Sequence, residues 1–380
     1  MDDNNINGKI KYFNNNYNFE KIFSIPLILN LFFKLLERDN IKCLSLCNKK
    51  IYKLYCNQVK KVKINRDTEI SNLKLLIDKY DNVNNLDLSG CKNINDFISI
   101  SKLERLEILV VSKSNICDIL FLEKNKNLKQ LNLYMCSYIE DFKPISNLER
   151  LEILDVSYTN ISDISFLENN KNLKQLNLNN CTNVKDFRPI SKLQQLEILE
   201  VNYTNISDVS FAEKTKNIKE LYILKSYYIE DFTPISKLER LEALDISKSS
   251  ISEISFLKSN KNIKQLYLYN CVDIDDFTPI FQLERLEILD ASITHISDIS
   301  FLEKNKNIKK LILGYCQYIN DFTPISKLEK LEILNVSYTS ISDISFLEKN
   351  KNLKELYFYK CENINQNDNI FNRKDITIFF

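Results

Sequence analysis

Apolar and polar residues alternate in short runs along this chain, and the same pair of runs returns every 45 residues. In one block, the first run has Leu128, Leu131 and Leu133 at its apolar positions, and the second has Leu151 and Leu154. Alternation with a period of two is typical of a β-strand that buries one face. We therefore expect two short strands in each block, with the leucines turned to the core and the intervening side chains turned to solvent.

The constant period predicts a repeat protein, because self-similarity at ~20–50 residues is the signature of stacked structural units. The two halves of the block are 23 and 22 residues long, and both fit the pattern L-x-x-L-x-L-x-x-N/C-x-L. On this pattern, residues 83–375 resemble the leucine-rich-repeat family. The units start at Val83, Leu106, Leu128, Leu151, Leu173, Leu196, Ile218, Leu241, Ile263, Leu286, Ile308, Leu331 and Leu353.

The resemblance implies an α/β repeat solenoid, a horseshoe with a parallel β-sheet on its concave face. Short 3₁₀ or irregular turns are expected on the convex face, because the repeated step D-F-x-P-I places a proline where a long helix would need a donor. The phenylalanines of the D-F and S-F steps, from Phe97 to Phe346, are expected to form a buried spine behind the sheet. The aspartates of the same steps recur along the array, so they are interpreted as caps of turn N–H groups rather than as catalytic carboxylates.

Function is expected where the repeats differ, on the concave face. Positions three, five and seven of each unit point there, and along the chain they change from small polar residues to tyrosines. The residues predicted to bind a protein substrate are Tyr222, Leu224, Asp245, Tyr267, Tyr269, Asp290, Tyr357 and Tyr359. Carboxylates at position five recur on every second strand, ~10 Å apart, so they can stay charged and form an acidic line. They are Asp155, Glu200, Asp245 and Asp290. A face that is merely solvated is the alternative.

Residues 21–56 precede the repeats and carry apolar residues at helical spacing. An early proline, an aromatic pair and a later run L-S-L-C-N-K-K-I make this segment similar to an F-box. The resemblance implies docking on a Skp-type adaptor of a cullin ubiquitin ligase. The adaptor-binding residues that it implies are Ile25, Pro26, Leu29, Phe32, Phe33, Leu36, Ile41, Leu44, Cys47 and Ile51. An α-helical cap over the open end of the solenoid is the alternative, because such arrays need one.

The remaining segments are assigned from their composition and pattern. Residues 1–20 are rich in asparagine and are expected to be disordered, because they cannot bury enough apolar surface to offset ordering entropy. Residues 57–82 are interpreted as an irregular first repeat, with a strand around Val62 and a helix from Ser71 to Tyr80. The apolar run at 376–380 is expected to add a closing strand, and a disordered tail is the alternative.

Composition excludes several classes of partner. The formal net charge of +1 gives no global basic field for nucleic acid or an anionic membrane. The most apolar run, from Ile22 to Leu36, is too short to span a bilayer, and no targeting segment is found. Ten cysteines without a C-x-x-C pair, together with a single histidine, predict no metal and no other cofactor. Reduced, buried thiols favour a cytoplasmic protein, or a nuclear one.

The sequence shows no arrangement typical of an enzyme. Three glycines cannot form a phosphate-binding loop, and one histidine without a G-x-S-x-G motif does not favour a hydrolytic triad. That histidine, His295, occupies a slot that Asn160 and Ser250 fill in other units. The chain is therefore predicted to be a non-catalytic interaction protein that recognises substrates for a Skp–cullin–F-box ubiquitin ligase. The alternative is a stand-alone leucine-rich-repeat scaffold with a helical cap.

Overall fold

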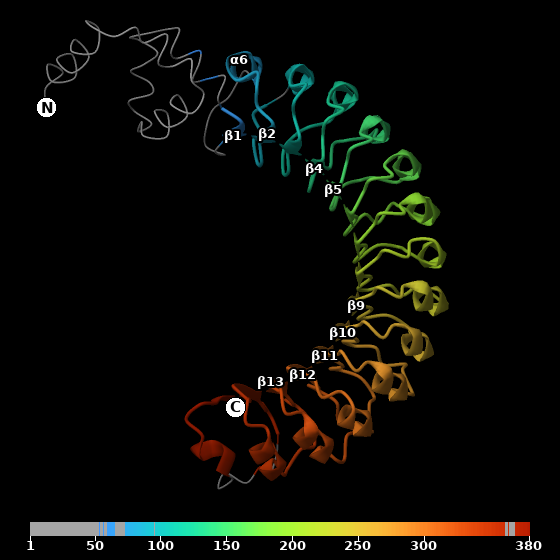
Figure 1. Cartoon of the computed structure of the whole chain (residues 1–380), viewed down its shortest axis with the longest axis vertical. Coiled ribbons are helices and arrows are strands. Elements are labelled where there is room, and N and C mark those ends of the chain that lie inside the picture. Colours follow the sequence, from blue (N-terminus) through green and yellow to red (C-terminus); the bar gives the residue numbers. More distant parts are fainter. Residues whose placement is uncertain are drawn as a thin grey trace, which may run out of the picture.

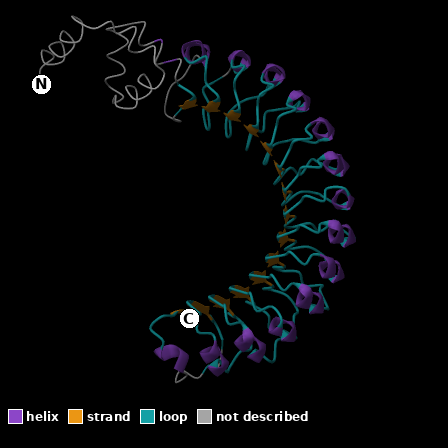
Figure 2. Cartoon of the chain, in the orientation of Figure 1, coloured by secondary structure: helices purple, strands orange, loops and turns teal. Residues whose placement is uncertain are grey.

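The computed structural model describes residues 53, 56, 59–64, 73–94, 96–361, 364 and 369–380. In this part of the chain, fifteen strands join one parallel sheet in the order of the sequence, β1 to β15. The sheet lines the inside of a curved arc, and the helical turns lie on its outside (Figure 1, Figure 2). The expected fold class, a repeat solenoid with a parallel sheet on its concave face, is confirmed.

Each strand is three residues long, and in most strands a buried central residue lies between two half-exposed neighbours. The strands are β1 (Lys61–Lys63), β2 (Asn85–Asp87), β3 (Ile108–Val110), β4 (Gln130–Asn132), β5 (Ile153–Asp155), β6 (Gln175–Asn177), β7 (Ile198–Glu200), β8 (Glu220–Tyr222), β9 (Ala243–Asp245), β10 (Gln265–Tyr267), β11 (Ile288–Asp290), β12 (Lys310–Ile312), β13 (Ile333–Asn335), β14 (Glu355–Tyr357) and β15 (Thr377–Phe379).

One described α-helix, α6 (Leu73–Lys79), and a series of 3₁₀ helices cover the convex side. The 3₁₀ helices are η1 (Ile98–Lys102), η2 (Leu120–Lys124), η3 (Lys143–Asn147), η4 (Ser165–Asn169), η5 (Arg188–Lys192), η6 (Ser210–Glu213), η7 (Thr233–Lys237), η8 (Ser255–Ser259), η9 (Thr278–Gln282), η10 (Ser300–Glu303), η11 (Thr323–Lys327), η12 (Ser345–Lys349) and η13 (Asn369–Asn372). Repeated prolines such as Pro144 lie in the first turn of these helices. A backbone N–H group there has no partner within the helix, so proline, which lacks one, removes no hydrogen bond.

The core is a stack of identical positions from successive units. Neighbouring strands pair in register, so Leu131 lies beside Leu154, and Leu154 lies beside Leu176. The phenylalanines of the D-F and S-F steps are also buried, with Phe142 5% exposed and Phe166 6% exposed, which confirms the predicted spine. At its end the spine is looser, because Phe346 is only partly buried.

The ninth position of each unit forms a second stack, in which sulfur and oxygen alternate over much of the array. Thr159 donates its hydroxyl to the Val156 carbonyl of its own unit at 2.7 Å, whereas Cys136 donates its thiol across to the Val111 carbonyl at 3.2 Å. The thiol contact is the longer of the two because sulfur is the larger atom, and a thiol is also the weaker donor. The position-nine ladder consists of Cys91, Ser114, Cys136, Thr159, Cys181, Thr204, Ser226, Ser249, Cys271, Thr294, Cys316, Thr339 and Cys361.

A buried amide clamps units together behind the sheet. Asn170 is fully buried, and its Nδ2 donates to the carbonyls of Ile145 and Leu148, each at 3.0 Å. Its Oδ1 has no hydrogen-bond partner among the described residues. The equivalent asparagines repeat both bonds and share the unpaired oxygen. They are Asn125, Asn260, Asn305 and Asn350.

Irregular units cover the two described ends of the array. β1 pairs with β2, and α6 buries Leu73 and Ile77, so the strand and the helix expected in this region are confirmed. At the other end, β15 pairs with β14 and forms the expected closing strand. The ring of Phe358 packs edge-on against Phe371 and Phe380, at centroid distances of 6.0 and 4.9 Å.

Candidate functional site

Five of the eight residues predicted to bind a partner end strands of the concave sheet. Tyr222, Asp245, Tyr267 and Asp290 end the consecutive strands β8, β9, β10 and β11, and each pairs in register with the next. These residues therefore form one row in which tyrosine and aspartate alternate. Tyr357 ends β14, three strands further along the sheet.

The other three predicted residues follow their strands by two positions. Leu224 and Tyr269 are half-buried, whereas Tyr359 is 41% exposed. In the row of strand ends, Ile312 and Asn335 separate Asp290 from Tyr357. The structure thus brings the row from Tyr222 to Asp290 together and leaves the C-terminal tyrosines as a second group.

Hydrogen bonds along each strand fix the tyrosine rings of the row. The hydroxyl of Tyr222 donates to Glu220 Oε2 at 2.9 Å, and that of Tyr267 donates to Gln265 Oε1 at 3.0 Å. Tyr357 donates to Glu355 Oε2 at 2.8 Å and stacks on Phe379 at a centroid distance of 4.3 Å. Burial raises the pKa of Tyr222 and of Tyr267, so both phenols stay protonated at neutral pH.

The acids of the row are already used by the fold. Asp245 Oδ1 accepts the backbone N–H of Ser247 at 2.9 Å, and Asp290 Oδ1 accepts that of Ser292 at 3.0 Å. Burial raises the pKa of Asp245, and the negative charge of Asp290 raises it further. Sequence reasoning missed this capping, although the D-x-S spacing at the ends of β2, β5, β9 and β11 is typical of an aspartate that bonds its own backbone two residues on.

A polar hollow of about 430 Å³ lies beside Tyr222, over β4 to β8, where the sequence predicted small polar residues together with Asp155 and Glu200 of the acidic line. Its carboxylates are held by amides: Asn132 Nδ2 donates to Asp155 Oδ2 at 2.9 Å, and Asn179 Nδ2 donates to Glu200 Oε2 at 2.7 Å. Tyr222 lies at its border, so the hollow continues into the tyrosine–aspartate row.

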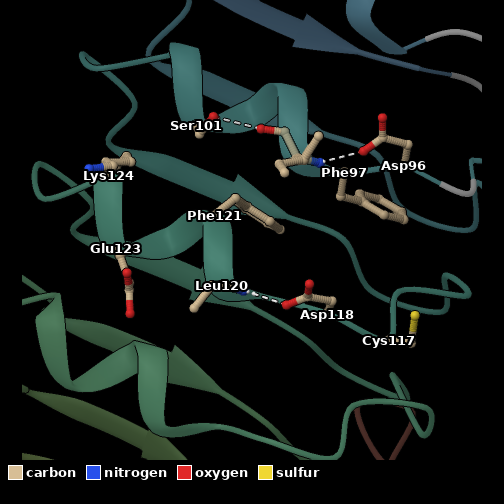
Figure 3. A pocket seen from close by; sticks show the side chains of 10 residues that line it. Asp96, Phe97, Ser101, Cys117, Asp118, Leu120, Phe121, Glu123 and Lys124 are labelled. Atoms are coloured by element: carbon tan, nitrogen blue, oxygen red, sulfur yellow. Dashed lines mark hydrogen bonds between the residues drawn. The ribbon is translucent and has the colours of Figure 1, made fainter.

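A second hollow, of about 410 Å³, lies on the convex side between η1 and η2 (Figure 3). Ile98 and Leu120 line it with 66% and 56% of their surfaces exposed, next to the exposed thiol of Cys117. Sequence reasoning missed this patch. Aligning the repeats could have revealed it, because Leu120 occupies the position that Ser165 and Ser210 occupy in later units.

The aspartates of the convex turns act as the predicted caps. Asp141 Oδ1 accepts the backbone N–H of Lys143 at 2.9 Å, and Asp163 Oδ1 accepts that of Ser165 at 2.8 Å. The Ser165 N–H group and hydroxyl both lower the pKa of Asp163, with the backbone group the larger cause. The lowered pKa favours the charged form of Asp163, and the bonds to the turn N–H groups explain why these aspartates recur.

Two protein-family models match parts of the repeat array. A family model described as "Leucine Rich repeats (2 copies)" matches residues 149–192, and another, "Zer-1-like, Leucine-rich repeats", matches residues 232–318. Among curated protein sequences, none matches the chain.

Solved structures match most of the chain. An internalin (inlF) of Listeria monocytogenes is 26% identical and has a TM-score of 0.67, over 81% of this chain and 89% of its own. A leucine-rich-repeat protein of Leptospira interrogans is 21% identical and has a TM-score of 0.75, over 85% and 84% of the two chains. The chain is a leucine-rich-repeat solenoid. Such repeats mediate protein–protein interaction, and the described face fits a binding role.

Within the described ranges, the leucine-rich-repeat solenoid has no group of three or more His, Cys, Asp or Glu side chains that could hold a metal ion. His295 is exposed and packs edge-on against Tyr318 at 5.3 Å, as a substitution in a surface slot would. No helix in the part of the chain that the structure describes is long and apolar enough to cross a membrane.

The F-box-like segment of the leucine-rich-repeat chain is not placed by the structure. All of its adaptor-binding residues, from Ile25 to Ile51, lie outside the described residues, as does the asparagine-rich stretch 1–20. No F-box match accompanies the leucine-rich-repeat matches. The adaptor-docking role rests on the sequence resemblance alone.

Proposed function

We propose that this chain is the substrate-recognition subunit of a Skp–cullin–F-box ubiquitin ligase in the cytoplasm or nucleus. In this function the repeats hold a protein substrate on the concave face, and residues 21–56 dock on a Skp-type adaptor. The chain contributes no catalytic group and acts by bringing the substrate close to the ligase.

The alternating row from Tyr222 to Asp290 is the observation that carries the binding role. Its side chains vary between units, while the leucines and phenylalanines behind them repeat. Tyrosines held by hydrogen bonds lose little further entropy on binding, so they suit the anchor residues of an interface. Acids between aromatic rings suit a partner segment that combines lysine or arginine with apolar side chains.

The concave surface is tested by substituting two neighbouring tyrosines. Tyr267→Ala together with Tyr269→Ala should weaken substrate capture by more than ~2 kcal/mol, the size of an interface hot spot. The matched control is Tyr138→Ala with Tyr228→Ala, because these tyrosines are 62% and 61% exposed and lie beyond the sheet. Equal losses in both variants, or cross-links from the partner to the convex turns, would show that the wrong surface was chosen.

The adaptor arm is tested by affinity purification of the full chain from cells, followed by detection of Skp and cullin subunits. Phe33→Asp should abolish their recovery, because a carboxylate cannot enter an apolar groove that takes a helix. Circular dichroism should show the repeats still folded. If the unaltered chain recovers no adaptor and residues 21–56 bind none at micromolar concentration, the stand-alone scaffold with a helical cap is the better description.

A further inference from the structure

Every regular strand is followed, three residues after its end, by a residue in the left-handed region of backbone space. The φ angles of these residues lie between 53° and 75°. We call them the left-handed row; because all strands are parallel, the row runs along one rim of the solenoid. It consists of Gly90, Lys113, Met135, Tyr158, Asn180, Tyr203, Lys225, Lys248, Asn270, Ile293, Tyr315, Tyr338 and Lys360.

The turn itself does not call for tyrosine at these positions. A left-handed backbone brings Cβ close to the following carbonyl oxygen, so glycine, asparagine and aspartate are the residues that adopt it routinely. Gly90, Asn180 and Asn270 show that the same slot accepts them here. Four tyrosines nevertheless occupy it, at φ angles of 57°, 57°, 62° and 57°. They are Tyr158, Tyr203, Tyr315 and Tyr338.

These tyrosines are only partly covered, because between 36% and 46% of each residue is exposed, and the ring of Tyr158 packs edge-on against Tyr134 at 5.4 Å. Tyr315 and Tyr338 stack on each other at 4.2 Å, with their rings 7° from parallel. Among the described residues, the hydroxyls of Tyr158 and Tyr203 have no hydrogen-bond partner. These tyrosines are bulky residues in an unfavourable backbone conformation, and the hydroxyls of two of them are unbonded within the described residues. Such backbone outliers are a basis for inferring a functional role.

The chemistry of the row is one-sided. Lysine, tyrosine and asparagine place hydrogen-bond donors at the ends of their side chains, and no position holds aspartate or glutamate, although aspartate suits this backbone. Lysines also lie over neighbouring rings, with Lys225 Nζ 5.6 Å from the ring centre of Tyr203 and Lys248 Nζ 5.2 Å from that of Tyr269. The row therefore complements a ligand that offers acceptors and apolar rings.

The spacing of one pair, Tyr158 and Tyr203, points to the conformation of that ligand, whereas Tyr315 and Tyr338 follow the adjacent strands β12 and β13 and stack on each other. Tyr158 and Tyr203 are two strands apart, which is ~9.6 Å for strands spaced ~4.8 Å. A polyproline II helix advances ~3.1 Å per residue, so its every third residue recurs after ~9.3 Å. Proline has no N–H group, and its carbonyls in this helix are free to accept hydrogen bonds.

We propose that the left-handed row is a second binding surface, which borders the concave face along one rim and takes an extended proline-rich peptide laid along that rim. Its rings pack on the prolines, while its hydroxyl and ammonium groups donate to the peptide carbonyls. A single-stranded nucleic acid fits less well, because the carboxylates of Asp155 and Asp245 lie three residues before the row in their own units and repel phosphates.

The test uses the full chain with Tyr158, Tyr203, Tyr315 and Tyr338 all changed to asparagine. Binding of a fluorescein-labelled decaproline peptide is followed by anisotropy, and folding by urea denaturation. Affinity should fall at least about tenfold, because the aromatic anchors are gone. The denaturation midpoint should stay the same or rise, because asparagine suits the left-handed backbone better than tyrosine. Tyr138→Asn with Tyr228→Asn, which removes two exposed tyrosines outside the row, should leave affinity unchanged.

The proposal separates binding from folding and can fail on either count. A fall in the denaturation midpoint of the fourfold variant would make the tyrosines part of the framework and would overturn the proposal. It would also be overturned if the unaltered chain bound no decaproline at millimolar concentration, if the variant bound as well as the unaltered chain, or if labelled oligouridine bound in its place. The concave face is tested by its own variant, Tyr267→Ala with Tyr269→Ala, which leaves the four tyrosines of the left-handed row unchanged.

Discussion

The amide clamp at Asn170 allows the strength of the contact between units to be tested. Its Nδ2 reaches back to two carbonyls of the preceding unit, and the side chain is fully buried. Changing Asn170 to alanine removes both bonds and leaves the hydrophobic stack in place. The change therefore measures the polar part of the contact.

The expected loss follows from the hydrogen bonds that remain. The Ile145 carbonyl still accepts the N–H of Leu148, and the Leu148 carbonyl still accepts that of Leu151, both at 3.0 Å. No backbone group therefore loses its last partner, and each lost bond counts for ~0.5–1.5 kcal/mol. Removing Asn170 Oδ1, which has no partner among the described residues, relieves a small cost. Asn170→Ala should lower the free energy of unfolding by ~1–3 kcal/mol.

The neighbouring Asn172 supplies a matched control. It is exposed and donates one bond, from Nδ2 to the Glu149 carbonyl at 2.8 Å. Asn172→Ala should cost less than ~0.5 kcal/mol, as usual for surface positions. Urea denaturation followed by circular dichroism measures both variants, and amide hydrogen exchange shows where protection is lost. Equal costs for the two variants, or protection lost away from the contact between η3 and η4, would refute the clamp.

Three further predictions concern the same scaffold. Leu154→Ala truncates a central strand residue that is 1% exposed, and should lower the free energy of unfolding in urea by ~2–5 kcal/mol. A loss below ~1 kcal/mol would contradict its place in the core. Thr215 fills the slot of the clamp asparagine in one 22-residue unit, and Thr215→Asn should raise stability by ~1–2 kcal/mol, because Asn305 makes both bonds after an equally short η10. The Arg188 guanidinium and N–H group lower the pKa of Asp186 to about 2, against 3.8 for the free side chain. The charged carboxylate thus stabilises the folded state; this stabilisation is complete above pH ~4 and is lost as the pH falls towards ~2. In Asp186→Asn the urea denaturation midpoint should therefore depend less on pH between ~4 and ~2 than in the unaltered chain.

The fold could be predicted because repetition removes ambiguity from each short strand. A single L-x-x-L-x-L run is a weak signal. Leu131, Leu154 and their equivalents recur along the array, and they can all be buried together only if successive strands stack in register. The capping aspartates could be recognised for the same reason, because a residue that recurs in successive units has a structural role in the repeat.

The features that sequence reasoning missed are departures from the average unit. Asn170 stands in a polar run, and its burial depends on carbonyls of another unit, which no local pattern reveals. Leu120 resembles an ordinary core residue until its slot is compared with Ser165, and only the structure shows it 56% exposed. The aspartates of the tyrosine–aspartate row were predicted to face the partner, and the structure adds that Asp245 also caps its own turn.

The position-nine ladder has a consequence for the oxidation chemistry of the protein. Its thiols occupy alternate units at most, so neighbouring sulfurs are ~10 Å apart along the sheet, whereas a disulfide needs Cα atoms within ~7 Å. Burial also raises the pKa of the Cys181 thiol to about 11, which leaves almost no thiolate to react at neutral pH. Thr159 and the other hydroxyl rungs thus act as spacers that prevent cross-linking. The ladder would therefore stay reduced in an oxidising compartment as well as in a reducing one.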